Sequence, residues 1–250
     1  MLMRQKLFIF IIGLFCFTFV LKNGDTLRAV ESPTNGSTSK PAHSVVAKDP
    51  ADLCELLSVH DKTSEYKWVK RNGDGKVIAI VLHGEHVNDG NVRLLAQMPE
   101  LTSISMFCSS NPLSSDALAE LGKLENLEAL TISSLPPECL LTDDHLAGIG
   151  RMKNLKSLCI RYVKIQPAGI RHFVQLKKLT ALSISSSSKF TLESLTSIKL
   201  IPKLEKLDLY DVGFTAKDIS DSGLRDRIKI TFRENDKIDS ENEDIKAESK

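Results

Sequence analysis

The sequence predicts an α/β fold in which short parallel strands alternate with short helices through about six stacked turns. The first observation behind this prediction is a recurring L-x-x-L-x-L pattern, with apolar residues at its first, fourth and sixth positions. The pattern begins at Val77, Leu101, Leu127, Leu155, Leu179 and Leu204, which are 24, 26, 28, 24 and 25 residues apart. A period of about 20 to 30 residues is typical of chains that stack one small structural unit.

The second observation is a helix start in every turn. An apolar residue is followed by a polar one, and a further apolar residue stands four positions after the polar residue. The six examples begin at Val87, Leu113, Leu141, Ile165, Phe190 and Phe214. The polar residue can cap the first helical turn while the apolar residue before it packs onto that turn. Pro167 falls at a first helical position, where its missing N–H costs nothing.

The third observation is the constant phase between the two patterns. Apolar residues continue three apart through each predicted helix, and in five turns the third of them lies three residues before the next strand pattern. Those five residues are Met98, Leu124, Met152, Leu176 and Ile201. Because one turn cannot bury its own apolar face, stacking of the turns must build the core.

Both ends of such a stack need a cap. Residues 50–59 are predicted to form an amphipathic helix behind Asp49, and residues 66–69 a strand in which Trp68 covers the first core layer. We therefore assign residues 50–76 to an N-terminal cap and residues 77–232 to the stacked turns. The alternation of Ile228, Ile230 and Phe232 predicts a last strand.

The register of residues 68–232 resembles that of leucine-rich-repeat proteins. Residues 155–170, LKSLCIRYVKIQPAGI, are most similar to the short-period repeats of exported bacterial, planctomycete-like proteins. The resemblance implies a curved solenoid, with a parallel sheet on its concave face and short helices on its convex face, used mainly for protein recognition. The ninth repeat position carries Ser109, Leu135, Val163 and Ser187 instead of the asparagine that links neighbouring loops in the commonest class, so we expect less regular loops.

The two ends of the chain are predicted to lie outside the folded unit. Arg4 and Lys6 precede the uncharged apolar residues 7–21, which suit a signal peptide or an N-terminal anchor within residues 1–29. Residues 30–49, rich in Ser, Thr and Pro, read as a disordered linker, and the charged residues 233–250 as a disordered tail. We expect a secreted, periplasmic or membrane-anchored protein whose turns lie outside the cytoplasm, with membrane contact only through the N-terminal segment.

Charge argues against nucleic acid as a partner. The chain has 33 basic and 32 acidic residues, and residues 1–29 hold four of the basic and one of the acidic ones. The rest therefore carries 29 basic and 31 acidic residues, a net charge of −2, with no basic block. A binding site for nucleic acid normally needs such a block.

The strand positions between the buried residues are expected to face a partner. Most of them are small and polar, whereas binding energy usually concentrates in aromatic and arginine side chains. The seventh position holds the largest side chains, and its candidate partner-binding residues are His83, Phe107, Arg161 and Tyr210. Two alternatives stay open: the longer loops at residues 109–112 and 135–139 could form the binding surface, or these side chains could be unrelated surface residues.

No residue pattern in the chain favours catalysis, and no cofactor or metal is expected. The sequence His83-Gly84-Glu85-His86 lacks the spacing that places two histidine ligands on one helix face, so we interpret it as two surface histidines. Four cysteines remain beyond residue 29, namely Cys54, Cys108, Cys139 and Cys159, and their pairing is open. A bridge between Cys108 and Cys139, in adjacent longer loops, is geometrically conceivable, whereas Cys108 and Cys159 should stand two strands apart.

We therefore expect a non-catalytic protein–protein interaction scaffold of the cell envelope or exterior. Its partner is an unidentified protein or glycan, and the sequence leaves the oligomeric state open. The first alternative is an envelope-tethered structural component that self-associates. The second is an enzyme or toxin, for which the sequence offers no catalytic group.

Overall fold

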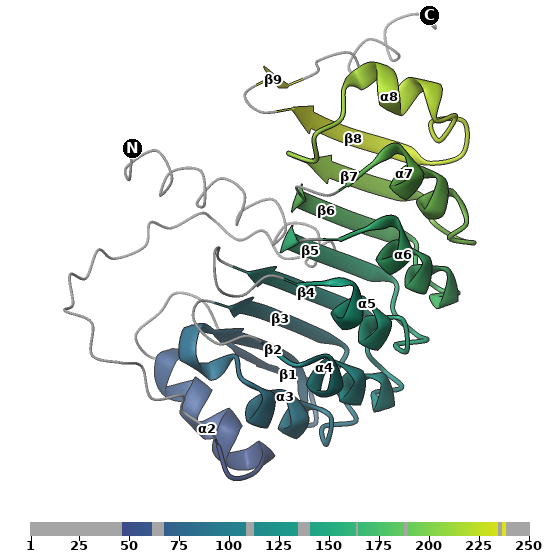
Figure 1. Cartoon of the computed structure of the whole chain (residues 1–250). Coiled ribbons are helices and arrows are strands. Elements are labelled where there is room, and N and C mark those ends of the chain that lie inside the picture. The colour runs from purple at the N-terminus through teal and green to yellow at the C-terminus, as the bar shows by residue number, and fades with distance from the viewer. Residues whose placement is uncertain are drawn as a thin grey trace, which may run out of the picture.

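The computed structural model describes residues 47–61, 68–108, 113–134, 141–163, 165–187, 190–234 and 237–238. These residues form an α/β fold whose strands belong to one sheet and follow one another in chain order. Neighbouring strands from β2 to β8 are parallel, whereas β1 and β9 pair antiparallel at the two ends of the sheet. Figure 1 shows this ladder of strands.

The strands are short, as the sequence pattern predicted. Their bounds are β1 (Val69–Arg71), β2 (Val77–His83), β3 (Ser103–Cys108), β4 (Ala129–Ser134), β5 (Ser157–Val163), β6 (Ala181–Ser187), β7 (Lys206–Tyr210), β8 (Lys229–Glu234) and β9 (Lys237–Ile238). Each parallel strand up to β7 is followed by a helix that returns the chain to the starting edge of the sheet. We call each such strand with its following helix a unit.

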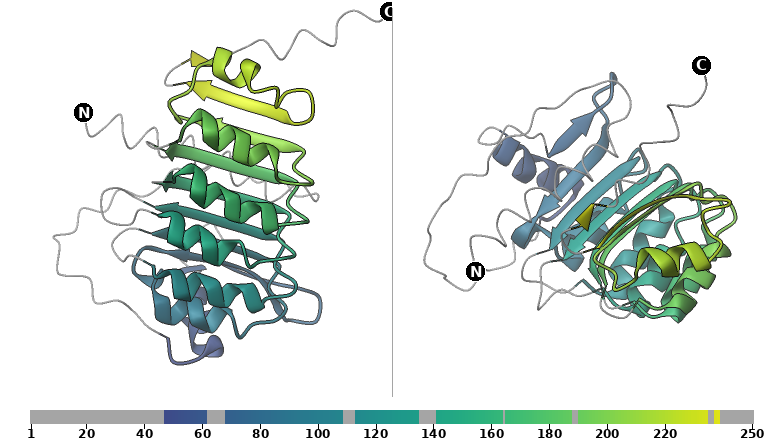
Figure 2. Two further views of the ribbon diagram at one scale, coloured as in Figure 1. Left: turned by 45° about the vertical axis from the view of Figure 1, so that its right-hand side comes forward. Right: turned by 90° about the horizontal axis from the view of Figure 1, so that it is seen from above.

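Helices α3 to α8 all lie on one face of the sheet, as the two views of Figure 2 show. The α-helices are α2 (Pro50–Asp61), α3 (Asp89–Leu95), α4 (Ser115–Glu120), α5 (Asp143–Ile149), α6 (Pro167–Ile170), α7 (Leu192–Lys199) and α8 (Ala216–Asp221), and the 3₁₀ segments are η1 (Gly84–His86), η2 (Leu121–Lys123) and η3 (Arg171–Gln175). The N-caps of α3 to α8 are Asn88, Ser114, Thr142, Gln166, Thr191 and Thr215. All six predicted helix starts are therefore confirmed.

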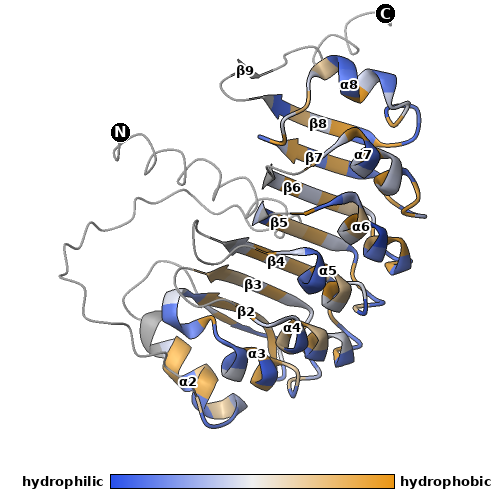
Figure 3. Ribbon diagram, in the orientation of Figure 1, coloured by the Kyte–Doolittle hydropathy of each residue, from blue (hydrophilic) through white to orange (hydrophobic). Residues whose placement is uncertain are grey.

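The core lies between the sheet and these helices. The first, fourth and sixth residues of each strand pattern are less than a tenth exposed in all six copies. The sheet register aligns them from strand to strand, as in the row that runs from Ile80 through Ile104 and Leu130 to Leu158. Phe173 of η3 is fully buried among the helices' apolar residues. Figure 3 shows apolar residues along the strands and on parts of the helices, whose remaining residues are hydrophilic.

The N-terminal cap contains the predicted helix, but its strand β1 lies at Val69–Arg71 and not at residues 66–69. Leu53 and Leu57 of α2 are fully buried, and Trp68 packs partly buried against the core. The expected linker of residues 30–49 is wrong at its end, because Ala47 is buried and its N–H donates to the Asn91 side chain at 2.9 Å. Residues 1–46, with the predicted signal segment, lie outside the described residues.

The C-terminal boundary also needs correction. The predicted tail of residues 233–250 begins too early, since Arg233 is in β8 and residues 237–238 form β9. Backbone pairing between these two strands outweighs the polar composition on which the prediction rested. The expected last strand is confirmed, because Ile228, Ile230 and Phe232 are buried at the end of the core.

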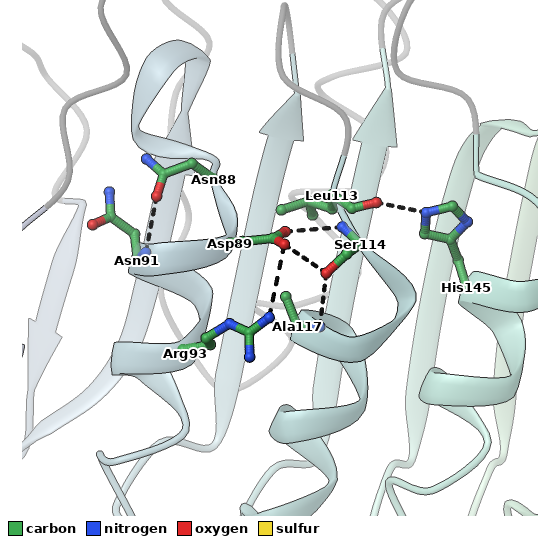
Figure 4. A network of polar contacts seen from close by, with 8 residues as sticks. All are labelled: Asn88, Asp89, Asn91, Arg93, Leu113, Ser114, Ala117 and His145. Atoms are coloured by element: carbon green, nitrogen blue, oxygen red, sulfur yellow. Dashed lines mark hydrogen bonds and ion pairs between the residues drawn. The ribbon is translucent and has the colours of Figure 1, made fainter.

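Neighbouring units are joined along the edge where strands lead into helices. The Asp89 carboxylate accepts hydrogen bonds from the N–H of Ser114 at 2.9 Å and from its hydroxyl at 2.5 Å (Figure 4). His145 Nε2 donates to the Leu113 carbonyl at 2.6 Å, and its Nδ1 accepts from the Thr142 N–H at 3.1 Å.

The arrangement recurs two units beyond Asp89. The Asp143 carboxylate accepts from the N–H of Gln166 at 2.8 Å. Carboxylates and an imidazole at the first turns of α3 and α5 thus supply bonds between units along this edge. The loops at residues 109–112 and 135–140 lie outside the described residues, so the expectation of irregular loops stays a prediction.

Candidate functional site

Helices α3 to α8 cover one face of the sheet and leave the opposite face of β2 to β8 without a helix of this set (Figures 1 and 2). Side chains at the third, fifth and seventh pattern positions point to this opposite face, because side chains alternate along a strand. We call it the open face. It contains all four residues that the sequence predicted as partner-binding.

The register confirms that the seventh positions form one column across the sheet. We call this set column seven, and it consists of His83, Phe107, Ser133, Arg161, Ser185, Tyr210 and Arg233. Since adjacent strands are about 4.8 Å apart, Phe107, Arg161 and Tyr210 recur about every 10 Å with a serine between each pair. The column therefore alternates large and small side chains over β3 to β7.

At the N-terminal end of the column, three rings stack. The His83 imidazole lies 5.3 Å from the Phe107 ring, centroid to centroid, with 23° between their planes. On its other side the Trp68 ring centroid is 5.8 Å away. We call Trp68, His83 and Phe107 the aromatic stack. The sequence did not place Trp68 in the site, because Trp68 belongs to the cap and precedes the first repeated strand.

Burial sets the charge of this stack. Burial of the imidazole lowers the pKa of His83 below its ordinary value, and the neighbouring His86 lowers it further. His83 is nevertheless an exposed residue, with its ring between two aromatic neighbours. At neutral pH the stack therefore presents an uncharged, largely apolar surface.

At the C-terminal end of the column, a second group combines an aromatic ring with charges. The Arg233 guanidinium carbon lies 5.6 Å from the centroid of the Tyr210 ring, a cation–π distance. Asp208, two residues before Tyr210, is 5% exposed and pairs through Oδ2 with Lys206 at 3.1 Å. Its other oxygen, Oδ1, is buried and accepts no hydrogen bond from the described part of the chain. The sequence missed Arg233 because the predicted tail began there.

The middle of the column differs from both ends. Arg161 is only 6% exposed and engages in a contact of its own, and the flanking Ser133 and Ser185 are 6% and 2% exposed. Phe107 and Tyr210 are half-buried, so a partner can reach them more readily than Arg161. The four predicted residues thus lie in one column, but they form two separate groups with a buried arginine between them.

Other candidate features add no chemistry to this face. Among the described residues, no three His, Cys, Asp or Glu side chains are placed to hold a metal ion. The loops at residues 109–112 and 135–139, with the predicted loop surface and the Cys139 side of the predicted disulfide, lie outside the described residues. Cys54, Cys108 and Cys159 are buried, and burial raises the pKa of the Cys54 thiol.

Similarity to known proteins adds no assignment. A comparison with protein-family models found no matching family, and a comparison with curated proteins found no relative. None of the helices in the described part of the chain is long and apolar enough to cross a membrane. The function must therefore be argued from the open face itself.

Proposed function

We propose that this chain is a leucine-rich-repeat solenoid that binds a partner protein through its open face and catalyses no reaction. The observation that carries the proposal is column seven, which places an aromatic stack at one end of the face and the Tyr210–Arg233 pair at the other. Protein interfaces draw most of their energy from aromatic and arginine side chains, with small polar contacts around them. The serines between the large residues let a partner backbone approach closely.

The unsatisfied oxygen of Asp208 supports a polar contact at the C-terminal group. A buried carboxylate oxygen without a donor is costly, and a donor from a partner would remove that cost. An N–H or hydroxyl of the partner could approach it between Ser183 and Thr231, which flank Asp208 in the register. Binding would then use an apolar contact at the aromatic stack and a hydrogen bond about five strands away.

We further propose that the chain acts outside the cytoplasm, with residues 7–21 serving as a signal peptide or anchor. The charge count of the remaining chain supports a protein or glycan in preference to nucleic acid. Self-association as an envelope component is the competing role. The experiment below distinguishes them, because a second copy of the chain would then be the captured partner.

The test is affinity capture from native envelope extract with the full chain and with Phe107→Ala/Tyr210→Ala. Both substitutions truncate half-buried rings on the open face, and circular dichroism checks that the variant stays folded. The matched control is Leu192→Ser, which removes an exposed apolar side chain from the helix-covered side. We expect a partner held by wild type and control, and held at least about tenfold more weakly by the double variant, since a hot-spot truncation costs more than about 1 to 2 kcal/mol.

Equal capture by all three proteins would move the site away from the open face. A partner that proves to be a second copy of the chain, with sedimentation showing the same self-association for wild type and double variant, would favour a structural role.

A further inference from the structure

A second surface stands out at the opposite edge of the sheet, where each helix leads back into the next strand. Three consecutive units contribute residues 150–154, 176–179 and 199–204 to this edge. These segments contain six basic residues and no acidic one: Arg151, Lys153, Lys177, Lys178, Lys199 and Lys203. We call these six residues the basic edge. The next unit continues it with Arg225 and Arg227 around a single acid, Asp226.

The charges of the basic edge are available to a ligand. All six residues are exposed, and no ion pair within the described residues involves any of them. Of their side chains, only Lys177 binds a protein oxygen in that part of the chain, donating to the Val174 carbonyl at 2.9 Å. Helix dipoles favour cations at helix ends, but that effect is modest and does not require six of them.

An exposed leucine lies in the last of these three segments. Leu200 directly follows Lys199 in the sequence, and 58% of the residue is exposed. Its backbone is held on both sides, because Arg227 Nη2 donates to the Lys199 carbonyl at 2.8 Å and to the Ile201 carbonyl at 3.1 Å. A single exposed leucine is ordinary on a protein surface. An exposed leucine whose backbone is fixed beside cations that form no ion pair in the described residues is an arrangement suited to interfacial membrane binding.

The composition favours a lipid surface over other polyanions. Five of the six cations are lysines, which act as hydrated point charges and do not provide the paired, planar contacts with which arginine recognises single carboxylates or phosphates. The three segments contain no aromatic ring on which a nucleic-acid base could stack. A diffuse layer of anionic headgroups needs neither feature, and it offers an apolar layer beneath for Leu200.

We propose that the basic edge is a peripheral membrane-binding surface that docks on anionic lipid headgroups and inserts Leu200 between them. This surface is separate from the open face and leaves column seven accessible to a partner. The lysines reach the headgroups while their methylene chains lie along the interface.

The first test locates the contact with a tryptophan at either end of α7. The full chain is prepared as Leu200→Trp and, as matched control, as Leu192→Trp; Leu192 is 56% exposed at the other end of the helix, next to the Arg171–Glu193 ion pair. Fluorescence is recorded with vesicles of brominated phosphatidylcholine containing about 30% phosphatidylglycerol, with the wild-type signal of Trp68 subtracted. We expect quenching at position 200 and none at position 192.

The second test measures the charge contribution. Lys153→Gln/Lys178→Gln/Lys203→Gln is compared with Lys48→Gln/Lys70→Gln/Lys217→Gln, which removes the same charge from exposed lysines elsewhere. Each cation near an anionic surface is worth about fivefold in partitioning, so the first triple variant should bind anionic vesicles about 100-fold more weakly at low salt. The control triple should bind as wild type does, and wild type should lose the preference for anionic over neutral vesicles at high salt.

The rest of the chain is identical in every pair of variants, so residues 1–46 affect both members equally. Equal quenching at positions 192 and 200, or quenching at neither, would overturn the proposal. So would equal losses for the two triple variants. Retention on an acidic protein or a nucleic acid without quenching at position 200 would assign the basic edge to that polyanion and overturn lipid binding.

Discussion

The two edges of the sheet use their charged residues differently. Where strands lead into helices, Asp89, Asp143 and His145 bind backbone groups of the neighbouring unit. Where helices lead back into strands, the six cations of the basic edge form no ion pair in the described residues. These groups of the first edge hold neighbouring units together, whereas the cations of the basic edge are available for binding.

The difference follows from the backbone groups that lack hydrogen-bond partners at each edge. Helices begin at the first edge, where backbone N–H groups lack partners and carboxylates can accept from them. Helices end at the second edge, where the unsatisfied groups are carbonyls. There, Asn126 and Asn154 already bind carbonyls of the preceding unit, at 2.9 and 2.6 Å. The lysines of the basic edge are therefore in excess of the structural need.

The largest effect should come from Asp89→Ala. The substitution removes both acceptors for Ser114, so the free energy of unfolding should fall by about 2 kcal/mol, measured by urea denaturation. Arg93→Gln is the control, because Arg93 is 3.9 Å from Asp89 and exposed, and its loss should cost less than about 0.5 kcal/mol. Similar losses for the two variants would show that the ion pair, and not the bond between units, stabilises this edge.

Gly169→Ala should destabilise through the same edge. A Cβ at this position would lie 2.3 Å from Asp143 Oδ1, which accepts the Gln166 N–H. Displacing that carboxylate should cost about 1 to 2 kcal/mol of unfolding free energy, although alanine favours a helix. Gly73→Ala, with nothing within 4 Å, should be nearly neutral.

A double-mutant cycle would identify the cause. In an Asp143→Ala background the added methyl group no longer meets a carboxylate, and Gly169→Ala should become neutral or stabilising. A loss that persists in that background would point to Leu146, whose Cδ1 lies 3.0 Å from the same position.

A smaller effect concerns pH at His83, which ends β2 at the first edge. The lowered pKa of His83 means that the unfolded chain takes up a proton more readily than the folded one. The stability contribution is therefore intact above the ordinary value of 6.5 and is lost as pH falls below it. His83→Asn should lose less stability than wild type between about pH 7.5 and 5.5. An NMR titration midpoint for His83 at or above 6.5 would contradict the lowered pKa.

The smallest effect should come from the basic edge itself. Lys153→Gln/Lys178→Gln/Lys203→Gln removes three exposed cations that form no ion pair with the described residues, so the free energy of unfolding should change by less than about 0.5 kcal/mol. Thermal and urea denaturation of the isolated protein provide the measurement. A loss comparable with that of Asp89→Ala would show that both edges serve stability and would remove the contrast between them.

Much of the fold could be predicted because burial imposes a period on the sequence. The strand pattern places Ile104 and Met106 in the core, and the polar residues after each apolar staple became N-caps. The candidate site could be predicted only as a column. His83 and Phe107 occupy the same pattern position in successive strands, so they were expected to be neighbours. In the structure their rings stack.

The sequence by itself determined which residues face the helices and which face outward, because a two-residue alternation in strands and a spacing of three to four in helices can be read from one chain. Only the tertiary structure decided how accessible the outward residues are. Arg161 became buried while Phe107 stayed within reach, Trp68 joined the stack from the cap, and Asp89 bound Ser114 from 25 residues away. Such contacts depend on distances between units, and a repeat pattern records only the order of the units.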